Sequence, residues 1–92
     1  MIIRICTEDK NSERVRELCA KRFDAFTIYR GMGAWKGKLE PSMTIEIAVL
    51  GDNYQARETQ QGEAIFLARD IKKMNEQEAV LIEFVESTNV LI

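Results

Sequence analysis

The chain has 92 residues, of which 46% are hydrophobic and 30% are charged, and 13 basic against 15 acidic side chains leave a net charge of −2. This length predicts a single domain over residues 1–92, with a small core that association between copies would supplement. The charge balance lacks the basic excess of a nucleic-acid-binding protein, so we expect no nucleic-acid partner. The first residues turn polar too early for a signal peptide, and no apolar run approaches the ~20 residues of a membrane span. We therefore expect a cytoplasmic protein with no membrane partner.

The chain contains no histidine and two cysteines, Cys6 and Cys19. Without histidine it cannot form a Ser–His or Cys–His relay, and a standard zinc site would need more thiolates than these two. Cys6 lies in an apolar run and Cys19 on an expected helix face, so we interpret both as buried free thiols. The sequence predicts neither a metal site nor a cofactor.

The first half of the chain predicts a strand, a helix and a β-hairpin. The run IIRIC (2–6) is rich in β-branched residues, and Asn11 or Ser12 can cap the helix that follows. The segments AFTIYRGM (25–32) and SMTIEIAVLG (42–51) alternate in the manner of strands, and the glycine-rich GMGAWKGK (31–38) predicts the turn between them. One face of this helix follows the i, i+3, i+4, i+7, i+8 spacing, with Val15, Leu18, Cys19, Arg22 and Phe23.

The second half predicts another helix and a last strand. Asp52 or Asn53 can cap a helix that starts early, although the clear apolar stripe begins only at Ala64 and continues through Leu67, Ala68, Ile71 and Met74. Lysines near the end of this stripe complement the helix dipole. The run AVLIEFV (79–85) predicts the last strand, and the apolar tail after it is expected to dock on another surface.

The resulting order β-α-β-β-α-β is that of an α+β, ferredoxin-like fold, with a four-stranded antiparallel sheet and both helices on one face. The other face would then remain uncovered. Strand alternation gives that face a mixed set of side chains, so we expect self-association through it or through the strand edges. The set comprises Thr27, Tyr29, Thr44, Glu46 and Ala48.

The hairpin segment YRGMGAWKGKLEPS (29–42) is the strongest candidate for a site, because it holds three glycines, the only tryptophan and the only proline. Gly31, Gly33 and Gly37 are most simply explained as turn residues with positive φ, and the functional alternative is close approach of a ligand to bare backbone. Trp35 either covers the core of its own domain or anchors a neighbour or ligand, and its ring would attract a cation.

Three further side chains have both a structural and a functional interpretation. Tyr29 either packs across the strands or borders a site, and Glu40, just after the turn, is either solvated surface or a ligand contact. Glu46 lies in the middle of a strand between isoleucines, where a carboxylate must be paired or must face a polar cavity.

At GAWKGKLEPSMTIEIAV the chain resembles the PII/CutA superfamily of trimeric ferredoxin-like proteins, whose CutA members carry a similar Trp-Lys-Gly-Lys-hydrophobic-Glu run. It departs from CutA itself, because the histidine-proline-tyrosine segment is missing. It is more similar to phage-encoded S-adenosylmethionine (SAM) lyases, which share this PII-like fold. They show a glycine-aromatic-glycine-x-x-glutamate pattern at the hairpin and an EQ…VL pattern before the last strand. The matching residues are Gly33, Trp35, Gly37 and Glu40, then Glu76, Gln77, Val80 and Leu81.

This resemblance implies a homotrimer with sites between subunits, acting on SAM in the cytoplasm of an infected host cell. The functional tyrosine and glutamate of the family match Tyr29 and Glu40, which are therefore the expected catalytic residues. The expected substrate-binding residues are Gly31, Gly33, Trp35, Glu46 and Glu76.

The implied reaction is an intramolecular displacement, in which the SAM carboxylate attacks its own Cγ and forms homoserine lactone and 5′-methylthioadenosine. It needs positioning of the substrate but no metal, cofactor or external nucleophile. By consuming SAM, such an enzyme would counteract SAM-dependent host defences. The alternative is a non-catalytic PII/CutA-like trimer that binds a nucleotide or small metabolite between its subunits.

Overall fold

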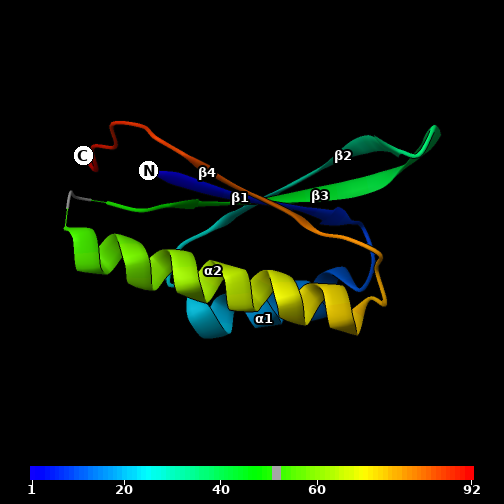
Figure 1. Ribbon diagram of the computed structural model, residues 1–92, viewed down its shortest axis with the longest axis horizontal. Helices are drawn as coiled ribbons and strands as arrows, with labels where there is room; N and C mark the ends of the chain where they lie inside the picture. Colours follow the sequence, from blue (N-terminus) through cyan, green and yellow to red (C-terminus); the bar gives the residue numbers. More distant parts are fainter. Residues whose placement is uncertain (51–52) are drawn as a thin grey trace.

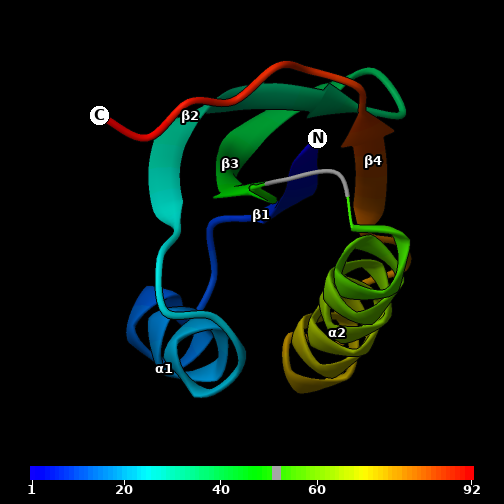
Figure 2. The same cartoon turned by 90° about the vertical axis from the view of Figure 1, so that its left-hand side faces the viewer.

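The computed structural model describes residues 1–50 and 53–92, so the candidate helix cap Asp52 lies outside the described residues. The elements follow in the order β1 (Ile2–Glu8), α1 (Ser12–Arg22), β2 (Thr27–Trp35), β3 (Lys38–Ala48), α2 (Tyr54–Met74) and β4 (Leu81–Val85). The strands form one antiparallel sheet in the order β2-β3-β1-β4. Both helices cover the same face of this sheet (Figures 1 and 2), which confirms the predicted α+β, βαββαβ fold.

The core lies between the sheet and the helices and follows the predicted alternation. In the register of β1 and β3, Ile3 pairs with Ile47 and Ile5 with Ile45, so both strands direct isoleucines toward the helices. The apolar stripes of the helices meet them there. The largest fully buried side chains are Ile3, Ile5, Val15, Cys19, Met43, Ile45, Leu67 and Ile71.

The two helix starts differ in how they are capped. Asn53 caps α2, because its side-chain oxygen accepts a hydrogen bond from the Ala56 N–H at 3.1 Å. This confirms the earlier of the two starts considered for α2. Before α1, Asn11 has a left-handed backbone with φ 51° and makes no side-chain capping bond, so the predicted side-chain cap of that helix is wrong.

The hairpin is longer than predicted, and its turn is shorter. β2 continues to Trp35 and β3 begins at Lys38, which leaves a turn of Lys36 and Gly37 with φ 50° and 78°. Positive φ at both positions is the geometry whose twist matches that of the flanking strands. The prediction that Gly31 and Gly33 are turn residues is therefore wrong, because they pair with Ser42 and Glu40 within the sheet.

From the Gly31–Ser42 pair to its tip, the hairpin extends past the end of β1 as a two-stranded arm (residues 31–42). Figure 1 shows this arm at the far end of the molecule from both termini. At the other end of the sheet, the residues after β4 lie across the start of β1 and the end of β3. Asn89 holds them there by donating to the carbonyl oxygens of Met1 and Val49 at 3.1 and 3.2 Å. In the described part of the chain, neither helix is long and apolar enough to cross a membrane.

Candidate functional site

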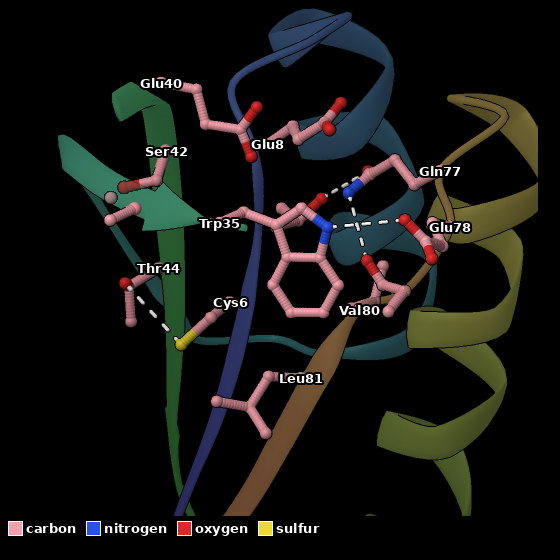
Figure 3. A pocket seen from close by; sticks show the side chains of 14 residues that line it. Cys6, Glu8, Trp35, Glu40, Ser42, Thr44, Gln77, Glu78, Val80 and Leu81 are labelled. Atoms are coloured by element: carbon pink, nitrogen blue, oxygen red, sulfur yellow. Dashed lines mark hydrogen bonds between the residues drawn. The ribbon is translucent and has the colours of Figure 1, made fainter. Parts of the chain in front are cut away.

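A cavity of about 500 Å³ lies where the hairpin arm approaches the loop between α2 and β4 (Figure 3). Its walls come from β1, β2 and β3 and from the chain just before and within β4. Gly33, Glu40, Ser42 and Thr44 share the helix-free face of the sheet, because alternate residues of paired strands point to the same side. The helix-free face therefore forms much of the cavity wall.

Three glutamates line this cavity, and among the described residues no lysine or arginine does. Glu78 pairs with Lys36 at 2.7 Å, whereas Glu40 has no ion pair within the described chain. The Lys10 ammonium lies 3.0 Å from Glu8 Oε2 but outside hydrogen-bonding geometry. This buried oxygen can therefore still accept a hydrogen bond. Glu8 pairs with Ser42, which makes Glu40 its diagonal neighbour on the same face. The arrangement favours a ligand that carries positive charge and hydrogen-bond donors.

A buried amide with a fixed orientation also borders the cavity. Thr7 Oγ1 and Asn75 Nδ2 both donate to Gln77 Oε1, at 2.5 and 3.0 Å, and Thr7 and Gln77 are only 5% and 8% exposed. Because two donors converge on Oε1, the amide nitrogen is left to donate, and it contacts the carbonyl oxygen of Ala79 at 3.4 Å. A primary amide has two N–H groups, so one remains for an acceptor on a ligand.

Of the residues predicted for the site, Gly33, Trp35 and Glu40 line the cavity together. Trp35 is 47% exposed and does not cover the domain's own core. Figure 3 places its indole ring near Cys6, Val80 and Leu81, which line the same cavity. Trp35 therefore borders the cavity, and its role as a ligand or neighbour contact stays a prediction.

Gly31, Tyr29, Glu46 and Glu76 do not line the cavity. Gly31 lies two pairs closer to the middle of the sheet than Gly33, opposite Ser42. Glu76 is exposed in the loop after α2, with a left-handed backbone of φ 53°.

Tyr29 and Glu46 instead form a second polar cluster with Arg4 on the helix-free face. Arg4 Nε donates to Glu46 Oε1 at 2.8 Å, which, together with a hydrogen bond from Tyr29, lowers the pKa of Glu46. The same bond to Glu46 raises the pKa of the Tyr29 hydroxyl. Glu46 is thus paired, as a carboxylate in mid-strand requires. Tyr29 pairs with Thr44, four residues and about 13 Å along β3 from Glu40, so the two expected catalytic residues are not brought together within one chain.

The two cysteines are free thiols in different surroundings. Cys19 is fully buried, and this burial raises its pKa to about 11. Cys6 is only half-buried, because it lies on the helix-free face, where Thr44 Oγ1 contacts its sulfur at 3.9 Å. Within residues 1–50 and 53–92, no three His, Cys, Asp or Glu side chains gather as a metal-binding group.

No protein-family model and no curated protein matches the chain. Among solved structures, the fold is similar to a phage SAM lyase in complex with S-methyl-5′-thioadenosine, with a TM-score of 0.57 and 20% identity over 89% of this chain and 77% of that one. A phage SAM lyase in the apo state gives a TM-score of 0.59 at 20% identity, over 89% and 76% of the two chains. The de novo designed protein Foldit4 gives 0.51 at 18% identity, over 94% and 93%. These likenesses establish the fold that the chain shares with a phage SAM lyase, and a fold alone does not specify an activity.

Proposed function

We propose that the chain is a SAM lyase that converts SAM to homoserine lactone and 5′-methylthioadenosine. The observation that carries this proposal is the lining of the cavity. Three carboxylates and an exposed indole ring line it, and in the described part of the chain no lysine or arginine does. SAM carries two cationic groups, a sulfonium and an ammonium, and both are suited to such surroundings. The fold shared with a phage SAM lyase supports the proposal.

The substrate ammonium is assigned to Glu40 and Glu8. Glu40 has no ion pair within the described chain, and Glu8 Oε2 has no hydrogen-bond donor, so both can accept N–H bonds from an ammonium. This ammonium keeps its charge throughout the reaction. Binding it therefore orients the methionine part of SAM rather than stabilising the transition state selectively.

The displacement itself requires little from the protein beyond a cavity that fits the substrate and excludes water. A carboxylate oxygen of SAM forms a bond to Cγ, the Cγ–S bond breaks, and its electron pair stays on sulfur. No proton is transferred. Because the carboxylate and sulfonium charges cancel as the reaction proceeds, apolar surroundings favour the transition state over the charged ground state. Trp35, Val80 and Leu81 supply such surroundings in the cavity.

Gln77 is proposed to orient the substrate as well. Its oxygen is occupied by Thr7 and Asn75, so it presents an N–H donor at the cavity wall. An acceptor of SAM, such as the carboxylate oxygen that does not attack, would bind there.

The proposal includes a homotrimer with sites between its subunits. The cavity lies against the helix-free face of the sheet, the face on which Tyr29 is exposed next to its partner Glu46. An adjacent copy lying against this face would cover the cavity and bring its own exposed groups, Tyr29 among them, to the ligand. Such an enzyme would lower the SAM available to SAM-dependent host defences.

Replacement of Glu40 tests the proposal, with Glu76 as the matched control. Glu40→Gln removes one charged acceptor of the ammonium and should lower kcat/KM for SAM by about 10- to 150-fold, the equivalent of 1.5–3 kcal/mol for a hydrogen bond to a charged group. Glu76→Gln, outside the cavity, should leave it unchanged. Wild-type turnover by Glu40→Gln would refute the site assignment, and binding of SAM without any turnover by the wild-type chain would favour the non-catalytic alternative.

A further inference from the structure

Glu78 joins the tip of the hairpin arm to the loop between α2 and β4. Its Oε1 accepts a hydrogen bond from Lys36 Nζ at 2.7 Å, and its Oε2 accepts one from the Trp35 indole N–H at 3.4 Å. Within the described chain, no other side-chain hydrogen bond or ion pair joins residues 35–38 to a different element. Among the polar contacts of the described side chains, Glu78 is therefore the one that ties the tip to the loop.

These contacts cross the cavity. Trp35 and Glu78 both line it, Trp35 from the end of β2 and Glu78 from the loop, and Figure 3 shows the bond between them. We propose that Glu78 is a positioning residue that holds Trp35 across the mouth of the cavity, so that the hairpin arm closes over a bound ligand. The proposal rests on the proposed function only in taking this cavity as the ligand site.

The backbone of the turn provides independent support. Lys36 has φ 50°, a left-handed conformation that favours Asn, Asp or Gly at this position of a two-residue hairpin turn. A lysine there carries a conformational cost that the turn alone does not require. Its ion pair with Glu78 gives that lysine a role, since it ties the tip to the loop.

The ion pair between Lys36 and Glu78 is weak enough to break and form again. The side chains of Lys36 and Glu78 are 66% and 62% exposed, and exposed ion pairs are worth about 0.2–1 kcal/mol. This corresponds to a preference for the closed position of roughly 1.4- to 5-fold. Salt screens such a pair, so the closed population should fall as ionic strength rises. A closure of this strength covers a ligand without trapping it.

Fluorescence tests the proposal without any ligand, because Trp35 is the only tryptophan of the chain. Glu78→Gln should increase quenching of Trp35 by acrylamide. In the wild type, quenching should increase between about 0.01 M and about 1 M salt, as the Debye length falls from about 30 to about 3 Å. Glu76→Gln, an identical change in the same loop but without contact to the hairpin, should match the wild type.

Exchanging the charges of Lys36 and Glu78 distinguishes a positioning role of Glu78 from a general effect of its substitution on the loop. Lys36→Glu combined with Glu78→Lys restores the ion pair but leaves no acceptor for the Trp35 indole N–H, so it should restore part of the protection that each single variant loses. The coupling between the two positions should be measurable as a double-mutant cycle. With 5′-methylthioadenosine bound, its release from Glu78→Gln should be about 1.4- to 5-fold faster. Equal quenching of Glu78→Gln and wild type, or an equal increase in Glu76→Gln, would overturn the proposal. Neither result depends on SAM turnover, so failure here is distinguishable from failure of the proposed function.

Discussion

Two glycines of β2 allow a matched test of whether the cavity is the ligand site. Gly31 and Gly33 lie on the same face of the same strand, but only Gly33 lines the cavity. A Cβ added at Gly33 would lie 3.4 Å from Ser42 Cβ, and one added at Gly31 would lie 4.0 Å from Ser42 Oγ. Neither glycine has positive φ, so the backbone can accept a larger side chain at both positions.

The expected loss of affinity follows from burial. In Gly33→Leu the new side chain would occupy the cavity, so a ligand could bind only by displacing this leucine side chain into solvent. Exposing a buried leucine costs about 1.5–3 kcal/mol, which corresponds to binding that is roughly 10- to 150-fold weaker. Gly31→Leu adds the same side chain outside the cavity and should bind like the wild type.

Calorimetric titration with 5′-methylthioadenosine and the rate of SAM turnover measure these effects, and circular dichroism confirms that both variants fold. Unchanged affinity in Gly33→Leu would refute the assignment of the cavity. An equal loss in both variants would also refute it, because the loss would then arise from the strand and not from the filled cavity.

Two further predictions concern stability. Thr7→Val removes a donor to the buried Gln77 oxygen and should cost about 1–3 kcal/mol, with a fall in Tm of about 4–8 °C per kcal/mol, so an unchanged melting curve would contradict the proposed network. Burial raises the pKa of Cys19 to about 11 from 9.0, so the unfolded state loses its proton first. Stability should therefore decline as pH rises from 9.0 to about 11, by about 3 kcal/mol in total, and urea denaturation of Cys19→Ala should lack this contribution.

Strand alternation and helical spacing were sufficient to predict the order of elements, because the isoleucines of β1 and β3 and the stripe of α2 all face one core. They were not sufficient to predict the hairpin turn. Gly31 and Gly33 look like turn residues in sequence, whereas in the structure they pair with Ser42 and Glu40 in the sheet. The actual turn carries Lys36 at a positive φ that its residue type does not favour.

The candidate site was only partly predictable for a related reason. Gly33, Trp35 and Glu40 are close in sequence, and their unusual composition points to them. Glu8, Gln77 and Glu78 come from β1 and from the loop before β4, and they reach the cavity only because β1 lies between β3 and β4 in the sheet. The EQ pattern pointed to this loop, but the burial of Gln77 depends on its bond to Thr7, a partner far away in sequence.

Strand alternation also explains why Tyr29 and Glu46 were expected together on the helix-free face. Alternation places both on the correct face, but it does not report how far along that face they lie. Their position beside Arg4 follows from the register of three strands, which single-strand patterns do not reveal.

The most direct test of the central claim is to incubate the purified protein with SAM in water labelled with a heavy oxygen isotope and to identify the products by mass spectrometry. The proposed displacement uses the substrate's own carboxylate. It therefore predicts equal amounts of 5′-methylthioadenosine and homoserine lactone, with no isotope in the lactone. Homoserine labelled on its hydroxyl oxygen would show that water attacks instead, and the absence of 5′-methylthioadenosine would contradict the assignment of the chain as a SAM lyase.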